Sequence, residues 1–531
     1  MSLEYMEYVE YAEQFVSTYF VPHIVTWYGL IGALIGAYFL GLYIKREIFR
    51  RQRGCKEPPV YPDGGILGLK LGYDLQYYKR EGRLVDFPVE MFKRYGSKTT
   101  FSAYLFGVRV VVSCEPENLK AILATQFEDF CLGARHAHFK PLLGNGIFTL
   151  DNEGWKESRQ LLRPQFAREQ VAHVKALEPH LQVLAKHIRK FQELGKTFDI
   201  QELFFRFTVD TSTEFLFGES VHSLYDDAIN MKTDPEVADF AQAFNETQKD
   251  LAVRAYLQVM YWIYNPPSFK RNTKIVHKFA KRFVNKALNL TPEELNEHCK
   301  HHYTFLYELA KQTRDPQVLQ DQLLNIMVAG RDTTAGLLSF CIFELARHQD
   351  VWQKLKEEIY ANFGSGDDAD IEKITFETLK SCTYLKWVIN EALRLYPSVP
   401  INFRTATRDT TLPIGGGKDG LSPVFVGKGT TVAYSPYVLH RMVKYYGKDA
   451  QVFRPERWET LKGLGWSYLP FNGGPRICLG QQFAITEASY VIARLCQIFP
   501  TLVSKDDKPD PCKKLIHLTM SHQEGVFVQM S

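Results

Sequence analysis

Cysteine is scarce in this chain: there are nine in 531 residues, and no two of them have the Cys-x-x-Cys spacing. This small and odd set argues against a disulfide framework and against a zinc ribbon. The chain also lacks a large excess of charge of one sign, because 64 Lys and Arg nearly balance 60 Asp and Glu and the net charge is +4. A nucleic-acid partner held by phosphate contacts is therefore not expected. No repeat of 20 to 50 residues is found, which excludes solenoids and propellers.

Apolar and aromatic residues are plentiful. Hydrophobic residues make up 45% of the chain and charged residues 23%, values typical of a globular protein rather than a disordered one. The aromatic share is 14%, with 37 Phe and 28 Tyr. This composition indicates a large core and favours an apolar cavity lined by aromatic rings.

One apolar run near the amino terminus is long enough to cross a membrane. Residues 24–44 contain no charged side chain, and a helix of this length would extend roughly 32 Å, the thickness of a bilayer's hydrocarbon core. Basic residues follow the run and glutamates precede it. The positive flank predicts a single-pass anchor, with residues 1–23 lumenal and the rest of the chain cytosolic. The run is too long, and its basic flank on the wrong side, for a cleaved signal peptide.

The remaining chain is expected to form one unit. Residues 45–65 are basic and then rich in Pro and Gly, which predicts a stiff linker. Helical spacing of apolar residues dominates residues 115–400, and short strand-like segments lie within residues 98–112 and 401–432. The fold class is therefore mainly α (α+β), with one helical domain over residues 66–531 and small peripheral sheets.

One cysteine stands in an unusual setting. Cys478 ends the string Phe-Asn-Gly-Gly-Pro-Arg-Ile-Cys and comes just before a helix that is predicted to begin at Gln481. The free N–H groups and the dipole at a helix N-terminus lower the pKa of a thiol and favour the thiolate, the form that binds metal. Gly474 and Gly480 leave room for a flat ligand, and Arg476 can hold an anion on it. On spacing alone, a buried structural cysteine is the alternative.

The whole string resembles the haem-binding loop of the cytochrome P-450 family, F-x-x-G-x-R-x-C-x-G. All five fixed positions match, at Phe471, Gly474, Arg476, Cys478 and Gly480. The resemblance implies a haem b (iron protoporphyrin IX) cofactor. It also implies that Cys478 is the axial thiolate ligand of the haem iron and that the other four residues bind the cofactor.

A second motif lies inside a helix predicted over residues 321–348. Its glycines and threonines are poor helix formers, so the segment needs another explanation. Gly330 allows close approach to the backbone, and the Thr333 hydroxyl can bond to the carbonyl of Ala329 and open the helix. Asp332 beside Thr333 is then an acid–alcohol pair able to relay protons. A kinked core helix is the alternative. The string resembles the family's oxygen-activation motif, [AG]-G-x-[DE]-T-[TS], which implies catalytic roles for Thr333 and Asp332.

Three further motifs resemble the family's pattern. Glu391 and Arg394 form E-x-x-R, and with Arg457 they are expected to make the family's buried structural triad; Trp458 replaces the usual Phe there. Trp155 and Arg159 match W-x-x-x-R, and the resemblance implies that both contact the haem propionates, as does Arg404. Solvated surface positions are the alternative for these last three residues.

The resemblance also implies an activity. Residues 398–413 look like those of the yeast group that hydroxylates n-alkanes and fatty acids, which implies a membrane-anchored monooxygenase of long-chain n-alkanes and fatty acids that acts at the terminal (omega) carbon. By analogy, the substrate pocket is expected to use residues from four segments. They are Phe148, Ala329, Gly330, Val399, Ile401, Phe403 and Leu518.

No flavin-binding or dinucleotide-binding pattern occurs in the chain, so electrons must come from a partner. The expected partner is an NADPH-dependent cytochrome P-450 reductase; O2 and the lipid bilayer are also expected partners, and the location is the endoplasmic reticulum membrane. Three alternatives stay open. One is a hydroperoxide isomerase or dehydratase, against which the Asp332–Thr333 pair argues. The others are a monooxygenase of another lipophilic substrate such as a sterol, and a haem sensor or membrane scaffold without turnover.

Overall fold

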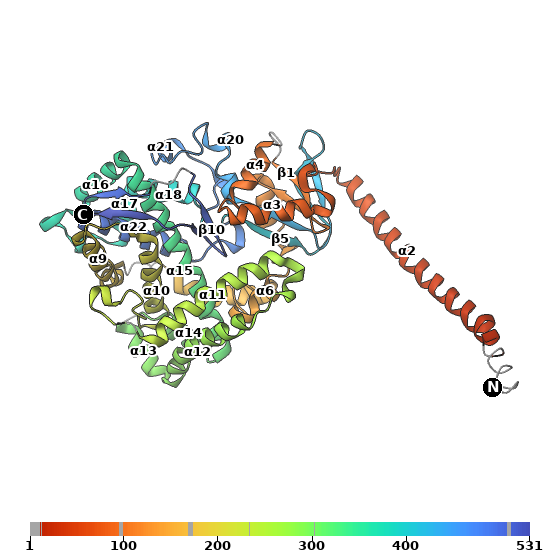
Figure 1. Cartoon of the computed structure of the whole chain (residues 1–531), viewed down its shortest axis with the longest axis horizontal. Helices are drawn as coiled ribbons and strands as arrows, with labels where there is room; N and C mark the ends of the chain where they lie inside the picture. The colour runs from red at the N-terminus through yellow and green to blue at the C-terminus, as the bar shows by residue number, and fades with distance from the viewer. Residues whose placement is uncertain are drawn as a thin grey trace.

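The computed structural model of the chain describes residues 11, 13–94, 99–167, 174–232, 234–301, 303–506 and 511–531. Residues 1–10 and 12 of the predicted lumenal segment lie outside the described residues. The long helices fill one side of the body, and the largest sheet lies on the side from which the amino-terminal helix projects (Figure 1).

The helices account for most of the body. The long helices are α2 (Val21–Gln52), α9 (Glu178–Glu193), α10 (Ile200–Phe217), α11 (Pro235–Leu257), α12 (Pro267–Asn289), α15 (Pro316–Arg347), α16 (Gln349–Phe363), α18 (Thr383–Leu395) and α22 (Gln481–Ile498). The shorter ones are α3 (Leu69–Arg80), α4 (Asp86–Arg94), α5 (Pro116–Lys120), α6 (Arg135–Leu143), α7 (Asn152–Leu162), α13 (Pro292–His301), α14 (Phe305–Gln312), α17 (Phe376–Ser381), α19 (Pro436–Leu439), α20 (Val443–Tyr446) and α21 (Arg457–Thr460).

The strands form four small sheets at the periphery. Their bounds are β1 (Thr100–Leu105), β2 (Val108–Ser113), β3 (Phe130–Cys131), β4 (Phe198–Asp199), β5 (Asn402–Ala406), β6 (Thr410–Gly416), β7 (Ser422–Val426), β8 (Thr431–Tyr434), β9 (Leu502–Ser504), β10 (Lys514–Ile516), β11 (Met520–His522) and β12 (Phe527–Met530). The largest sheet has the order β1-β2-β8-β5-β3, and a smaller one the order β4-β12-β9; β6–β7 and β10–β11 are hairpins. The expected mainly helical fold with small sheets is confirmed.

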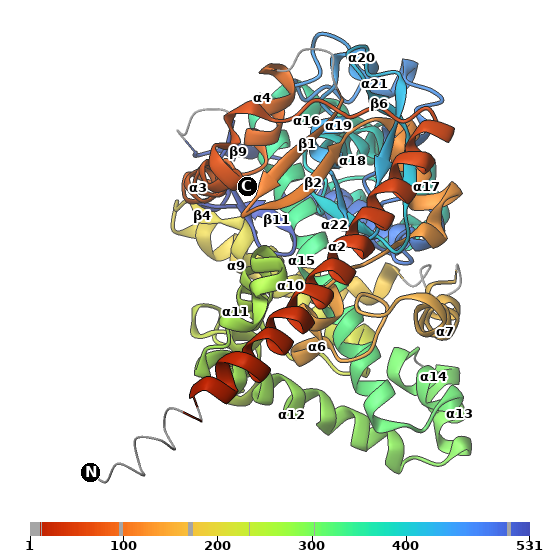
Figure 2. The ribbon, with the colours of Figure 1, turned by 90° about the vertical axis from the view of Figure 1, so that its right-hand side faces the viewer.

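Helix α15 runs through the body and is packed by helices on several sides (Figure 2). Its start is well defined, because Pro316 occupies the first turn and the Asp315 side chain accepts hydrogen bonds from the N–H groups of Gln317 and Val318. In the most apolar window of α15, 78% of the residues are buried inside the protein. This length of apolar helix is therefore a core element that holds the functional site, although its composition would also suit a membrane span.

Helix α2 is apolar and unburied. It includes the other membrane-compatible window, over Thr26–Gln52, none of which is buried inside the protein. The helix projects away from the body (Figure 1). A projecting helix of this length and composition suits a membrane anchor.

The helix extends past the predicted anchor, residues 24–44, into the basic first part of the predicted linker. Helix α2 continues to Gln52, because Lys, Arg and Glu are good helix formers and the first strong breaker is Gly54. The rest of the segment is attached to the body: the N–H group of Lys56 donates to the Pro423 carbonyl over 2.9 Å. Arg46 pairs with Asp409 at 3.2 Å. The end of the anchor helix is thus fixed to the β6–β7 region.

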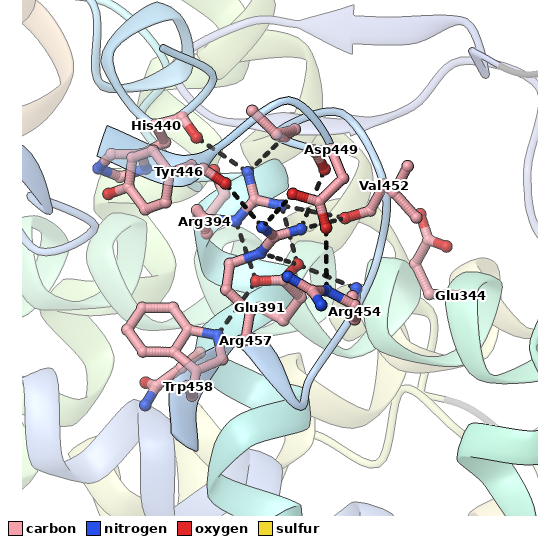
Figure 3. A network of polar contacts seen from close by, with 12 residues as sticks. Glu344, Glu391, Arg394, His440, Tyr446, Asp449, Val452, Arg454, Arg457 and Trp458 are labelled. Atoms are coloured by element: carbon pink, nitrogen blue, oxygen red, sulfur yellow. Dashed lines mark hydrogen bonds and ion pairs between the residues drawn. The ribbon is translucent and has the colours of Figure 1, made fainter. Parts of the chain in front are cut away.

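A buried ionic cluster joins α18 to the chain ahead of the cysteine loop (Figure 3). Glu391 and Arg394 are fully buried, and their side chains make two hydrogen bonds of 2.8 and 2.9 Å. Arg457 donates to the same carboxylate over 3.2 Å. The predicted grouping of Glu391, Arg394 and Arg457 is therefore observed, and a buried carboxylate shared in this way is fully paired, as burial requires.

Trp458, the departure from the family's pattern, takes part in this cluster. Its indole N–H donates to Glu391 over 3.1 Å, a hydrogen bond that the Phe usual in the family does not have. No motif predicts this bond, and Trp458 lies 67 residues from Glu391 in the chain.

We expect Trp458→Phe to lower the free energy of unfolding by about 1.5 kcal/mol, because the variant removes a hydrogen bond to a buried charged group. The urea midpoint followed by helical circular dichroism would measure this change. Trp262→Phe is the matched control, since Trp262 is 68% exposed and its replacement should leave the midpoint almost unchanged. Equal effects of the two substitutions would contradict the assignment.

Candidate active site

A cavity lies between α15, α10, α7 and the loop that precedes α22. Most of the residues predicted to form the site line it: Phe148, Trp155, Arg159, Ala329, Gly330, Thr333, Val399, Arg404, Phe471, Arg476, Cys478 and Gly480. Apolar side chains such as Ile147, Leu216 and Ile326 complete the walls. The described lining residues include no Asp or Glu. The cavity is therefore apolar, with one thiol and several guanidinium groups.

Cys478 lies just before the first turn of α22, as predicted, and Gly480 is the residue that caps this helix. The N–H group of Cys478 donates to the Phe471 carbonyl over 3.0 Å, which closes the loop. Burial nevertheless raises the pKa of the thiol, although the Gly480 N–H and the positive charge of Arg159 act in the opposite direction. Because Cys478 is exposed toward the cavity, the lowered pKa expected for the iron-bound thiolate stays a prediction. A metal ion bound at the sulfur would reverse the balance.

The two glycines of the loop serve different purposes. Gly480 lines the cavity. A Cβ on it would lie 4.0 Å from the sulfur of Cys478, which is an ordinary van der Waals distance. Gly474 does not face the cavity: its φ is +70°, and a Cβ there would be 1.9 Å from the Leu123 carbonyl oxygen. The interpretation of Gly474 as room for a flat ligand is therefore wrong, because this glycine allows the loop to pack against a neighbouring backbone.

The middle of α15 places its two candidate catalytic residues on different faces. The Thr333 hydroxyl lines the cavity and donates to the Ala329 carbonyl over 2.6 Å, as predicted. The Asp332 carboxylate instead faces Arg331 at 3.5 Å and is hydrogen bonded by Gln248 of α11. Burial raises the pKa of Asp332 and Arg331 opposes this. A direct Asp332–Thr333 pair is not formed, since consecutive residues of a helix point in different directions.

Three residues expected in the substrate pocket do not line it. In the strand β5, Asn402 and Arg404 face the cavity, so Phe403 between them points to the other side, and Ile401 is 38% exposed. The prediction placed Ile401 and Phe403 on the side of the strand that faces the cavity, whereas Asn402 and Arg404 lie on that side. Leu518 instead packs against the core formed by α12 and its neighbours.

A cluster of guanidinium groups lies at one side of the cavity. Arg476 donates to Asp151 over 2.7 Å and its guanidinium carbon lies 4.4 Å from the centre of the Trp155 ring. Arg159 donates to the Ile477 carbonyl over 3.1 Å. The Nε of Arg404 is buried and has no hydrogen-bond partner in the part of the chain that the structure describes. The cluster therefore has donors left over for an anion.

Arg135 is a fourth member of this cluster, and sequence reasoning missed it. Its guanidinium donates to the Asn402 side chain over 2.8 Å and lies 5.0 Å from the Phe403 ring centre. Burial, together with the positive charges of Arg404 and Arg476, lowers the pKa of Arg135 to about 9. No motif surrounds this residue in the sequence, so only the fold shows that it joins the other three.

These residues fit a haem. The sulfur of Cys478 is an iron ligand, the walls are apolar, and the guanidinium groups are suited to the two carboxylates of protoporphyrin IX. The orphaned Nε of Arg404 and the lowered pKa of Arg135 both indicate cations that need an anion inside the cavity.

We expect Arg135→Met to speed the transfer of haem to an acceptor protein about tenfold or more, because one charge-assisted contact to a haem carboxylate is lost. The measurement is the absorbance change as apomyoglobin takes up the haem. Arg163→Met, at an exposed arginine, is the control and should leave the rate unchanged. A rate for Arg135→Met equal to that of the control would show that Arg135 does not contact the cofactor.

Comparison with known proteins agrees with this geometry. The family model described as Cytochrome P450 matches residues 62–529. Cytochrome P450 52A3-A of Candida maltosa is 58% identical over 513 residues, which cover 96% of this chain and 98% of the relative. Cytochrome P450 52A13 of Debaryomyces hansenii is 59% identical over 516 residues, with the same two shares. Cytochrome P450 52A6 of Candida tropicalis is 58% identical over 516 residues, again with these shares. The chain therefore belongs to the cytochrome P450 family and is a haem-dependent monooxygenase.

Proposed function

We propose that the enzyme hydroxylates long-chain n-alkanes and fatty acids at the terminal carbon. The observation that supports this most directly is the cavity: its walls are mainly apolar, and away from the guanidinium cluster the polar groups on them are the Cys478 sulfur and neutral groups such as the Thr333 and Thr334 hydroxyls. Transfer of an alkyl chain from water to such walls lowers the free energy. The end methyl has stronger C–H bonds than interior methylenes, so attack there requires walls that restrict which carbon approaches the iron.

The proposal assigns the haem to the residues described above. Cys478 would supply a sulfur ligand to the iron, and Arg135, Arg159, Arg404 and Arg476 would hold the carboxylates, with Trp155 packed against Arg476. A haem bound in this way supplies the activation of dioxygen with electrons from a redox partner. The protein holds substrate and excludes water, and the Thr333 hydroxyl holds a proton next to the reacting atoms, because it lies at the cavity wall.

Membrane and partner assignments belong to the same proposal. Helix α2 is unburied and apolar, which supports a single-pass anchor in the endoplasmic reticulum membrane with the catalytic domain in the cytosol. An NADPH-dependent cytochrome P-450 reductase is the proposed electron donor. The exposed residues Lys156 and Arg163 lie on or just after α7, which also supplies Trp155 and Arg159 to the cavity, and they can meet an acidic partner surface.

We expect the full chain, expressed with a reductase and supplied with dodecane, hexadecane, laurate or oleate, to form the terminal alcohol as its main product. Mass spectrometry would locate the hydroxyl group. Product formation should require both NADPH and oxygen. Hydroxylation at interior carbons would overturn the terminal-carbon assignment, and conversion of a hydroperoxide without NADPH would show an isomerase instead.

We expect Thr333→Ala to keep the haem but to lower the product formed per NADPH about tenfold or more, because the hydroxyl that holds a proton at the cavity is lost and electrons go to hydrogen peroxide. Parallel assays of NADPH, product and peroxide would measure this coupling. Thr333→Ser retains the hydroxyl and should stay near the wild type. Unchanged coupling in Thr333→Ala would remove Thr333 from proton transfer.

A further inference from the structure

Three elements meet beside the β10–β11 hairpin, and their side chains have no role in the site described above. The N–H group of Lys514, in β10, donates to the carbonyl of Gly82, just after α3, over 2.7 Å. The Nζ of Lys79, on α3, lies 5.6 Å from the centre of the Tyr256 ring, on α11. His517, in the turn of the hairpin, faces the positive charge of Lys79. The ends of α3 and α11 and the hairpin turn therefore form one cluster.

Lys79 carries a positive charge that no neighbouring acid neutralises. It is half-buried, burial lowers its pKa, and it has no ion pair or hydrogen bond within the part of the chain that the structure describes. Two acids of the adjoining segments are already paired. Asp86 pairs with Lys514 at 3.2 Å, and Glu524 pairs with Lys513 at 3.1 Å. An ammonium that has lost part of its hydration without gaining a counter-ion favours a bound anion.

Tyr256 supplies an unused hydrogen-bond donor next to this charge. Its hydroxyl is buried and has no hydrogen-bond partner among the described residues. Buried hydroxyls are normally paired, because removal of a polar group from water without a partner is unfavourable. Since the Lys79 ammonium lies against the same ring, one anion can contact both groups.

His517 adds a donor without adding a charge. Burial and the positive charges of Lys249 and Lys79 lower the pKa of His517 to about 4, so the imidazole is neutral at pH 7 and carries one N–H group. The Lys249 ammonium is paired with Glu246 at 2.7 Å. The cluster thus has one uncompensated positive charge with a hydroxyl and an imidazole beside it. A single carboxylate matches this set, because it carries one negative charge and accepts several hydrogen bonds.

The hairpin connects the cluster with the cavity. The N–H group of Met520, at the start of β11, donates to the Ser398 carbonyl over 3.0 Å, and Ser398 lines the cavity. His517 lies three residues before Met520, about 10 Å along an extended chain. The described lining of the cavity includes no Lys, and its guanidinium groups are assigned to the haem carboxylates. A long molecule with its apolar end in the cavity therefore finds a free cation only beyond the wall, at the hairpin turn.

We propose that Lys79, Tyr256 and His517 form a carboxylate site that binds the acid group of a fatty acid whose methyl end lies in the cavity. This inference rests on the proposed function and separates its two substrate classes, because an n-alkane has no group that the carboxylate site can bind. A chain held by its carboxylate at the turn and extended along the hairpin directs its opposite end toward Cys478. The carboxylate site thereby favours reaction at the terminal carbon of an acid.

Calorimetric titration of the haem-loaded full chain tests the carboxylate site without turnover. We expect laurate to bind more tightly than methyl laurate, which has the same chain without the charge. Lys79→Met should weaken laurate binding about tenfold, because a charge-assisted hydrogen bond is lost, and should leave methyl laurate and dodecane unchanged. Lys79→Arg keeps the charge and should stay near the wild type. Lys70→Met is the matched control, since Lys70 lies on the same helix, is exposed and pairs with Asp74 at 3.0 Å.

A second variant removes the hydroxyl alone. Tyr256→Phe keeps the ring and should weaken laurate binding about fivefold, with methyl laurate unchanged. Tyr73→Phe is its control, because Tyr73 is 71% exposed on α3 and its replacement should change neither ligand. A role of Tyr256 in packing alone would instead change the binding of laurate, methyl laurate and dodecane alike.

The carboxylate site and the proposed function fail in different ways. The inference is overturned if the wild type binds laurate no more tightly than methyl laurate, if Lys79→Met leaves laurate binding unchanged, or if Lys79→Met weakens both ligands equally. Formation of terminal alcohols alongside any of these results would leave the proposed function standing without the carboxylate site. If laurate binding depends on Lys79 while neither laurate nor dodecane yields a terminal alcohol, the proposed function fails and the carboxylate site stands.

Discussion

The place of Cys478 depends on a buried ionic cluster far from it in the sequence. Glu391 is shared by Arg394, Arg457 and Trp458, and none of these contacts reaches the cavity directly. Arg394 continues the connection, because its carbonyl oxygen contacts Nδ1 of His440 at 3.1 Å.

His440 completes the link to the cysteine loop. Burial and the charge of Arg394 lower the pKa of His440 to about 3, so the ring is neutral and its Nε2 accepts the Leu469 N–H over 2.8 Å. Two residues later Phe471 accepts the N–H of Cys478. Hydrogen bonds at His440 and Phe471, joined by the backbone between Leu469 and Phe471, thus connect the ionic cluster with the cysteine loop.

The cavity separates its charges from its reactive groups. Four guanidinium groups gather where the carboxylates of a haem would lie, and two threonine hydroxyls of α15 lie on its wall. The rest of the lining is mainly apolar and carries no charged side chain. This arrangement lets the protein bind an anionic cofactor tightly while it keeps the substrate space free of charge, which suits a substrate that partitions into lipid.

Sequence motifs predicted the cysteine loop, the Thr333 hydroxyl and the grouping of Glu391, Arg394 and Arg457, and they missed contacts that no motif describes. The string from Phe471 to Gly480 and the Thr333 hydroxyl were found because their geometry is local. The place of Arg135 in the guanidinium cluster and the hydrogen bond of Trp458 were not found, since no motif includes these contacts. Phe403 was misplaced because a strand alternates its faces, and motif likeness does not give the register.

The account depends most on sulfur ligation by Cys478, and X-ray absorption at the iron edge measures it most directly. The purified full chain should show one sulfur scatterer beside the porphyrin nitrogens, and Cys478→Ser should lose the sulfur while retaining nitrogen and oxygen neighbours. A wild-type iron with only nitrogen and oxygen ligands would contradict the account, as would a sulfur that remains in Cys478→Ser.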